Sequence, residues 1–455
     1  MRFLITTVLL MFVMLPGLAW AVETQEPTEY LAADANVADV VGLGTEGYGS
    51  PIQSDTIMSG ELISTRSGNF HPFLSLGTYH TDNLFNTEND EQSDTVAVIS
   101  PGMWVALPGS RQKLVDINTM NTAPGGLSLS RFRNESERRF QGYALYRADI
   151  REHDKYTEEN RTDHRGEGYL GVNLRGGLSL ELINVYEVKA DPYGTGGTPS
   201  REFDKFTSNL FNMTLAYQIT PKVTLRGDYG HYYLDYDADR NEYRNRQDDS
   251  FSAYVFYQIT PKTDVFVQTE YIKVDYDEDI KSDSDEMNYY VGIQLKATAK
   301  TRGRVKVGYG DKEYDRSDHD DQDDWLAEVQ LDHFFTPKTS VYLRAVRRIL
   351  ESDIETARNI TEYSTQIGYR QRFTAKLRGE ASLFYANDEY DGDITVGDQT
   401  DERDDDYIGF VAALGFTPVR WLNLSLGYEY RDRDSNFNTE DYTSNTVFIR
   451  MTAAL

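Results

Sequence analysis

Basic side chains recur at even-numbered positions in the second half of the chain, on the side opposite the apolar residues. The series comprises Lys296, Arg304, Lys306, Arg344, Arg348, Arg370, Arg372, Lys376 and Arg378. Acidic residues on that face are fewer, namely Glu328, Asp332 and Glu380. Alternate residues of an extended strand point to the same side, so these cations would line one surface. Such rows attract anions. The alternative is that each cation pairs with a neighbouring carboxylate across the strands.

Residues suited to covalent chemistry are sparse by comparison. The seven histidines are scattered without H-x-x-x-H spacing, and no G-x-S-x-G motif occurs. The one tempting cluster is Asp318-His319-Asp320, and solvation in an acidic loop explains it more simply. The string at 307–311, VGYGD, imitates a potassium-channel filter, which needs a loop between two membrane helices. We therefore expect no enzyme, no cofactor and no metal site.

A repeat reveals the elements that would position the basic residues. The hexapeptide YQITPK occurs at 217–222 and again at 257–262. Looser copies place equivalent residues at 221, 261, 299, 337, 375 and 418, separated by 40, 38, 38, 38 and 43. A fixed period in this range indicates a repeated supersecondary unit.

One unit reads as strand, acidic loop, strand and tight turn. After the first YQITPK, apolar and polar residues alternate over 223–230, which is the period of a strand. The stretch DYDADRNEYRNRQDDS is too polar to be buried, and alternation returns over 251–259. Thr-Pro-Lys suits the turn, because Pro pre-sets φ and Thr can hydrogen-bond the backbone before it. About ten alternating residues suffice for a tilted strand to cross a bilayer.

The N-terminus and the composition indicate the compartment. Residues 1–21 combine Arg2, an apolar run and the end Ala19-Trp20-Ala21, which predicts a secretory signal peptide. Residues 22–68 are rich in Gly, Asp, Ala and Ser and are expected to form a flexible periplasmic tail. The chain has no cysteine, a net charge of −28 and only 39% hydrophobic residues. These figures fit an extended soluble β protein or a membrane β-barrel.

Short turns that alternate with long acidic loops favour the barrel. We predict an all-β, transmembrane, antiparallel up-and-down β-barrel of about 18 strands over 69–455, with both ends on the periplasmic side. The expected strands are 70–80, 95–106, 138–150, 166–174, 178–190, 205–219, 222–235, 248–259, 262–276, 286–297, 302–312, 323–335, 338–350, 361–373, 376–387, 405–416, 420–431 and 442–455. Residues 108–137 break the pattern and would be an irregular insertion, a plug or one more hairpin.

A barrel of this size encloses an aqueous lumen, and the even-numbered basic residues would line it as a path for anions. Arg347 falls on the outward face, so it either lies at the membrane interface or is moved by a bulge. The acidic loops would keep the outer surface soluble. A sharper hypothesis is that they bind divalent cations and so contact lipopolysaccharide, although no run has EF-hand spacing.

The opening of the barrel resembles a known family. The features are Tyr79, the string Asp82-Asn83-Leu84-Phe85, an acidic loop and then Ile99-Ser100-Pro101-Gly102. They resemble outer-membrane β-barrel porins of the β-barrel porin 2 type, which are encoded beside exopolysaccharide genes in Gram-negative bacteria. The resemblance implies an outer-membrane location and a role in passing secreted polymer, handed over by a periplasmic polysaccharide export protein.

Three functional hypotheses follow. The first is a terminal pore for an anionic exopolysaccharide, and the second is a general or substrate-specific diffusion porin for small anionic solutes. The third is an outer-membrane barrel enzyme or surface adhesin that uses the acidic loops. The expected partners are outer-membrane lipid, lipopolysaccharide and the permeant, and no nucleic acid is expected.

Overall fold

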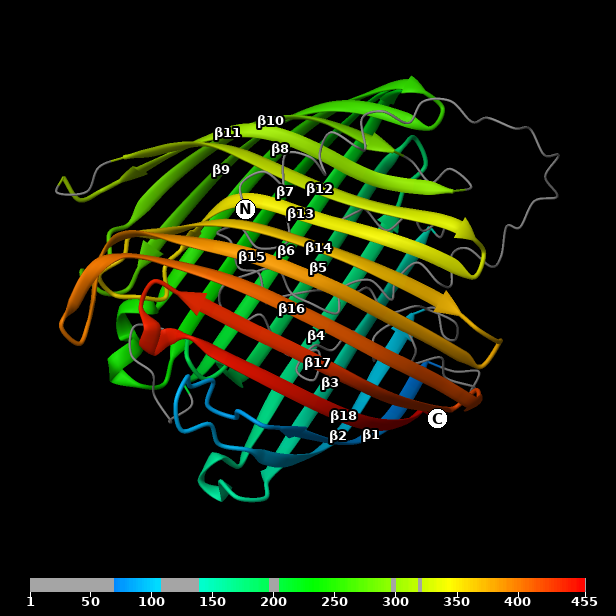
Figure 1. Ribbon diagram of the computed structural model, residues 1–455. Helices are drawn as coiled ribbons and strands as arrows, with labels where there is room; N and C mark the ends of the chain where they lie inside the picture. The colour runs from blue at the N-terminus through cyan, green and yellow to red at the C-terminus, as the bar shows by residue number, and fades with distance from the viewer. Residues whose placement is uncertain (1–68, 108–138, 196–203, 296–299, 318–320, 455) are drawn as a thin grey trace. The chain divides into compact units, whose positions relative to one another are not determined.

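Almost all of the described chain is in β-strands. The computed structural model describes residues 69–107, 139–195, 204–295, 300–317 and 321–454 (Figure 1). The strands are β1 (Phe70–Thr81), β2 (Asp94–Leu107), β3 (Phe140–His153), β4 (Arg161–Asn173), β5 (Leu178–Ala190), β6 (Lys205–Thr220), β7 (Val223–Tyr236), β8 (Arg246–Thr260), β9 (Thr263–Tyr276), β10 (Ser284–Leu295), β11 (Thr301–Tyr314), β12 (Gln322–Thr336), β13 (Thr339–Glu351), β14 (Asn359–Arg372), β15 (Leu377–Val396), β16 (Gln399–Val419), β17 (Leu422–Ser435) and β18 (Tyr442–Ala454). Short 3-10 helices, η2 (Thr157–Glu159), η3 (Asp239–Arg244) and η4 (Asn438–Glu440), lie in the connections.

The strands close into a ring. Each strand pairs antiparallel with its neighbours in the chain, and β1 also pairs with β18, from Phe73↔Ala454 to Thr81↔Thr446. The ring leaves no open sheet edge, which a bilayer would not tolerate. The prediction of an antiparallel up-and-down barrel of about 18 strands is confirmed.

The two ends of the barrel differ. Two-residue turns join β6 to β7, β8 to β9 and β12 to β13, and these are the Thr-Pro-Lys sites. The Thr220 hydroxyl accepts hydrogen bonds from the backbone N–H of Lys222 (3.2 Å) and Val223 (3.0 Å). The threonine therefore caps the residues after the proline rather than the backbone before it. The β1 start and the β18 end lie at this turn end, which is the periplasmic end in barrels of this type.

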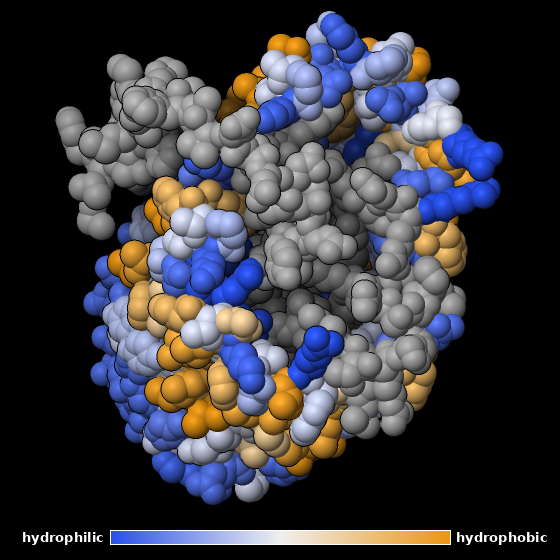
Figure 2. Space-filling model, turned by 90° about the vertical axis from the view of Figure 1, so that its right-hand side faces the viewer, coloured by the Kyte–Doolittle hydropathy of each residue, from blue (hydrophilic) through white to orange (hydrophobic). Residues whose placement is uncertain are grey.

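The two faces of each strand have opposite character. On β8, Val255, Tyr257 and Ile259 are about half exposed on the outside, while Ser252 and Tyr254 are buried on the inside. Apolar outside and polar inside reverse the usual arrangement of a soluble protein and match a lipid-facing wall. Figure 2 shows apolar side chains on the outer surface of this wall.

One hairpin is longer than the sequence indicated. We expected its strands at 376–387 and 405–416, but β15 and β16 continue to a tip at Gly397 and Asp398 (Figure 1). The ladder resumes after an irregularity, from Asp393↔Glu402 to Val396↔Gln399. The error came from composition, because the acidic residues read as a loop. Carboxylates that face water do not prevent strand pairing.

Some expectations lie outside the described residues. They are the signal peptide (1–21), the periplasmic tail (22–68), the insertion (108–137), Lys296 and the cluster Asp318-His319-Asp320. In the described ranges no helix is long and apolar enough to cross a membrane.

Candidate functional site

The structure places seven of the nine basic residues on the inner wall. They are Arg304, Lys306, Arg344, Arg348, Arg370, Arg372 and Arg378, on β11, β13, β14 and β15. Lys376 does not belong with them. It lies in the exposed turn between β14 and β15, where its Nζ donates to the Pro418 carbonyl (2.8 Å). Strand β14 ends at Arg372 and β15 begins at Leu377, so Lys376 lies in the turn, one residue before the strand on which we had placed it.

Carboxylates neutralise part of this set. Lys306 Nζ lies 3.2 Å from Glu328 Oε2, and Arg348 Nη2 lies 2.6 Å from Glu362 Oε2. The structure therefore supports the alternative of cross-strand pairing for these two cations. Glu362 was not among the acidic residues recognised in the sequence.

The turn-end half of the inner wall over β11–β15 is strongly basic. We call its charged residues the arginine cluster, which consists of Arg302, Arg304, Arg344, Arg370, Arg372 and Arg378 together with Asp332 and Glu380. Between the Lys306–Glu328 pair and the turns, the described part of this wall thus holds six guanidinium groups and two carboxylates. Among the described residues, the cluster therefore has more guanidinium groups than carboxylates.

Asp332 is shared among three of the arginines. Its carboxylate lies 3.3 Å from Arg302 Nε, 3.2 Å from Arg344 Nη2 and 3.9 Å from Arg370 Nη1. Arg370 also approaches Glu380 at 3.4 Å. Asp332 is thus a shared counter-ion of Arg302, Arg344 and Arg370.

Two members of the cluster face each other directly. Arg372 on β14 is the ladder partner of Arg378 on β15. Like charges directly opposite each other destabilise a sheet. An arrangement that costs stability at one point of the wall is a sign of a functional constraint.

Residues 352–358, here called the crossing loop, connect β13 to β14 and do not extend away from the barrel. Ser352, Asp353 and Ile354 are buried. Tyr243, between β7 and β8, donates its hydroxyl to the Asp353 carbonyl (2.7 Å). On the other side, Ile354 shares an apolar cluster with Phe437, between β17 and β18. Because β8 and β17 lie opposite each other in an eighteen-stranded ring, the loop crosses the mouth.

Charged groups hold the crossing loop at its base. Lys281 Nζ donates to the carbonyls of Ser352 (2.8 Å) and Ala357 (2.9 Å). Glu351 accepts from the Tyr276 hydroxyl (2.7 Å) and pairs with Lys312. Burial lowers the pKa of Lys281, in the β9–β10 connection, to about 7. The sequence did not reveal this loop, because its position depends on distant partners such as Tyr243, Lys281 and Phe437.

Another pattern was missed although the sequence contained it. On the inner wall, seven arginines pair with a carboxylate two residues away in the same strand. The pairs are Arg147–Asp149, Arg161–Asp163, Arg165–Glu167, Arg226–Asp228, Arg246–Asp248, Arg403–Asp405 and Arg431–Glu429. Residues two apart share one face of a strand, so a search for R-x-D, R-x-E and E-x-R along the sequence would have found them.

Aromatic rings flatten the inner wall at several points. A Cβ at Gly102 would overlap the ring of Phe73, its ladder partner on β1. The same holds for Gly368 and Tyr342 across β13 and β14. Because only glycine leaves room, each ring can lie against the neighbouring strand and does not project into the lumen.

Arg347 occupies the membrane interface, as one of the two expectations had it. Its guanidinium lies 4.6 Å from the ring centre of Trp325 and 4.7 Å from that of Tyr363, and it pairs with Asp324. The ladder with β12 is continuous from Ala327↔Arg347 to Phe334↔Ser340, so no bulge moves it. Cation–π contacts of this kind stabilise a charge beside lipid.

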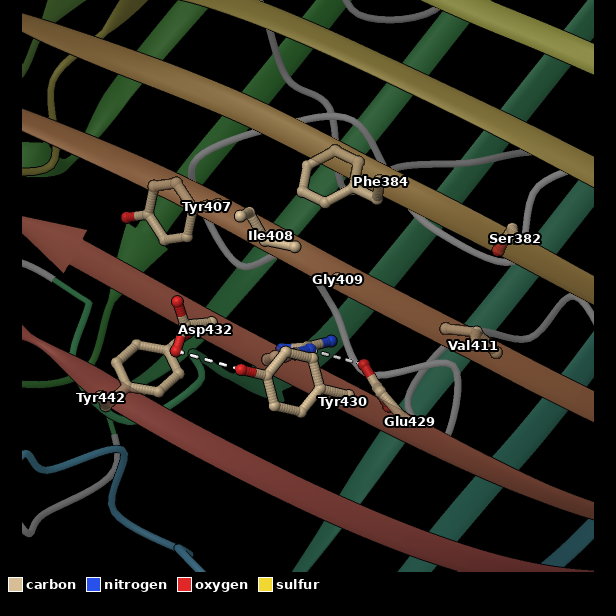
Figure 3. A pocket seen from close by; sticks show the side chains of 11 residues that line it. Ser382, Phe384, Tyr407, Ile408, Gly409, Val411, Glu429, Tyr430, Asp432 and Tyr442 are labelled. Atoms are coloured by element: carbon tan, nitrogen blue, oxygen red, sulfur yellow. Dashed lines mark hydrogen bonds and ion pairs between the residues drawn. The ribbon is translucent and has the colours of Figure 1, made fainter. Parts of the chain in front are cut away.

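A small cavity adjoins the wall between β15 and β18. It has about 360 Å³ of empty space, part of it open to solvent, and Gly409 leaves the opening. Figure 3 shows Phe384 and Tyr407 beside it, and the Tyr430 hydroxyl directed at Asp432 (3.3 Å). In the part of the chain that the structure describes, no three His, Cys, Asp or Glu residues are grouped closely enough to hold a metal ion.

A closed barrel with an apolar outer face and a charged inner wall defines a transmembrane β-barrel of the bacterial outer membrane. The chain belongs to the family described as "Putative beta-barrel porin 2", whose model matches residues 64–455. It is an outer-membrane porin of a Gram-negative bacterium, which confirms the family that the opening segment resembled. The family match does not show an association with exopolysaccharide.

Solved structures of similar shape are distant. They include outer-membrane protein OpdK of Pseudomonas aeruginosa, with 11% identity over 85% of this chain and 99% of that chain, at a TM-score of 0.42. Another is OccAB4 of Acinetobacter baumannii, with 12% identity over 86% and 99%, at a TM-score of 0.43. OccK2 of P. aeruginosa shows 9% identity over 86% and 100%, at 0.42. No curated protein matches the chain.

Proposed function

We propose that this porin conducts small acidic solutes and selects them by charge at its periplasmic end. The observation that carries the proposal is the arginine cluster, with six guanidinium groups around two carboxylates. Rings of basic side chains select anions in pores. The crossing loop favours small solutes over a polymer, because it spans the opposite mouth. No step of bond chemistry is needed.

The test is the reversal potential of the purified barrel in a planar bilayer under a salt gradient. The wild-type protein is expected to prefer chloride over potassium. Changing Arg370, Arg372 and Arg378 together to Ser removes half of the guanidinium groups and should abolish the preference. The matched control is Arg226→Gln, a buried inner-wall arginine on β7 outside the cluster, which should keep it.

A variant of opposite sign sharpens the test. Asp332→Asn removes the carboxylate that three arginines share, so the preference for anions should increase. A cation-selective wild-type current, or a triple variant as anion-selective as the wild type, would refute the proposal. The arginines would then serve only to pair with neighbouring carboxylates.

A second candidate is the export of an anionic exopolysaccharide received from a periplasmic export protein. The flattened inner wall favours it, because rings lying over Gly102 and Gly368 leave the bore free of projecting groups. The crossing loop would have to move aside. Deleting the gene should abolish extracellular polymer and spare growth on small acids if this candidate is right, and the reverse is expected for a diffusion porin.

A further inference from the structure

A larger cavity lies at the loop end of the barrel, away from the arginine cluster. It has about 690 Å³ of empty space, part of it open to solvent. Its walls are inner faces of β1, β3, β4, β17 and β18. Most of its lining residues are polar.

Two inward-folded loops form the roof of this cavity. Phe85, between β1 and β2, packs edge-on against Tyr193, between β5 and β6, with ring centres 4.9 Å apart. Asn86 Nδ2 donates to the Tyr193 carbonyl (2.8 Å). Arg433 of β17 donates to the Gly194 carbonyl (3.1 Å) and so ties the roof to the far wall. The cavity is thus built by elements that are distant in the sequence.

One atom in the lining that lacks a hydrogen-bond partner is Nε2 of His153. Its Nδ1 lies 2.9 Å from Asp94 Oδ2, and both side chains are fully buried. Asp94 Oδ1 accepts from the backbone N–H of Thr95 (2.7 Å) and Lys155 (3.1 Å), which marks Asp94 as an acceptor. This network assigns the ring proton to Nδ1. His153 Nε2 is buried without a partner, and it is left as an acceptor beside the cavity.

The other such atom is Nη2 of Arg431. Its Nε donates to Glu429 (2.5 Å), whereas its Nη2 is buried without a partner. Asp191, the other carboxylate of the lining, accepts from the Tyr236 hydroxyl (2.8 Å) and from Arg244 (3.0 Å). The cavity therefore contains one donor on a cationic side chain, Arg431 Nη2, and one neutral acceptor, His153 Nε2, that no protein group satisfies. Buried polar atoms usually have a hydrogen-bond partner.

We propose that this cavity binds a hydroxylated carboxylic acid of the sugar-acid class. The carboxylate of the solute accepts from Arg431 Nη2, and a hydroxyl of the same molecule donates to His153 Nε2. A neutral sugar offers no anionic acceptor to Arg431 Nη2, and a fully ionised anion without hydroxyls has no donor for the histidine. The inference deepens the proposed conduction of acidic solutes, for which the cavity is a binding station beyond the arginine cluster.

The experiment is isothermal titration of the folded barrel in detergent with sodium D-glucuronate, sodium phosphate and D-glucose. Arg431→Gln should weaken glucuronate binding at least about tenfold, because a charge-assisted hydrogen bond is lost, and Arg431→Lys should restore part of it. His153→Gln should weaken binding by roughly fivefold. Arg226→Gln removes an equivalent same-strand pair outside the cavity and should bind glucuronate as the wild type does.

Several outcomes would overturn the inference. They are no heat with glucuronate, equal affinity in the wild type and Arg431→Gln, or equal affinity for glucuronate and either phosphate or glucose. Heat-modifiable migration on gels shows which variants are folded. If His153→Gln fails to fold, the Arg431 variants and the double variant Glu429→Gln/Arg431→Gln decide.

The site and the proposed function fail separately. An anion-selective wild-type barrel that does not bind glucuronate removes the site and leaves the function. A cation-selective barrel that binds glucuronate through Arg431 removes the proposed function and leaves the site.

Discussion

The two ends of the inner wall use charge in opposite ways. At the turn end, six arginines surround two carboxylates, and Arg372 directly faces Arg378. At the loop end, Lys312 pairs with Glu351, and Arg403 is held by both Asp405 (2.7 Å) and Glu440 (3.4 Å). The excess of arginines at the turn end can act on a solute, and these paired charges at the loop end hold loops in place.

The loop-end pairs are buried, and each cation there depends on particular carboxylates. Removing one partner of a buried ion pair leaves a charge without solvent or counter-ion, at a cost of about 3–5 kcal/mol. In the arginine cluster, the loss of one cation instead relieves repulsion among the others. The comparison therefore predicts that charge changes affect selectivity at the turn end and stability at the loop end.

The largest effect is expected from the crossing loop. Replacing residues 352–357 by Asn-Gly removes the segment that spans the mouth, and the single-channel conductance should rise by roughly threefold or more. The preference for anions should persist, because the arginine cluster is untouched. Exchanging Gly397 and Asp398, at the exposed tip of the β15–β16 hairpin, for the same dipeptide is the matched control.

Unchanged conductance in the loop replacement would mean that the narrowest point lies elsewhere. A loss of the preference for anions would contradict the comparison of the two ends, because selectivity would then arise at the loop end.

A pair of single variants tests the contrast in stability. Arg403→Gln leaves Asp405 without its nearest cation and Glu440 with Arg433 alone, and it should lower the free energy of unfolding by about 3–5 kcal/mol. Arg370→Gln should cost about 1 kcal/mol or less, because neighbouring arginines still offset Glu380. Urea titration of the barrel in lipid vesicles measures both, and similar losses for the two variants would contradict the contrast.

The smallest effect concerns pH and Lys281. Its pKa is about 7 when the crossing loop is packed, through burial, and about 10.4 when the lysine is solvated. Between these values the displaced state binds more protons, so raising the pH stabilises the packed state by up to about 1.4 kcal/mol per pH unit. Below pH 7 both states are protonated and the effect levels off.

The open-state occupancy of single channels should therefore fall as the pH rises from 7 to 10. Glu351 and Asp353 of the loop base attract the lysine, whereas Arg244 and Arg246 repel it. Their charges do not change in this range, so Lys281→Met should show a flat profile. An equal slope in the variant would assign the titration to another group.

Much of this fold could be predicted from the sequence. Period-two alternation and the Thr-Pro-Lys turns gave all eighteen strands, because both are local properties. The parity of the strands also placed Arg370, Arg372 and Arg378 on the inner wall. Lys376 was misplaced, since nothing local marks where a strand ends and its turn begins.

The crossing loop and the loop-end cavity could not be predicted in this way. Both depend on contacts such as Tyr243 to Asp353 and Arg433 to Gly194, across 110 and 239 residues of sequence. Partner choice over such distances is set by the closure of the ring. The same applies to Glu362, which becomes a partner of Arg348 only when β13 and β14 are in register.

The same-strand Arg–carboxylate pairs bear on how such a barrel changes in evolution. A hairpin that contains Arg226–Asp228 or Arg403–Asp405 brings its own counter-ion. Duplicating or losing that hairpin leaves no orphan charge in its neighbours. YQITPK flanks the β7–β8 hairpin at a 40-residue spacing, and that hairpin contains two such self-neutral pairs, Arg226–Asp228 and Arg246–Asp248.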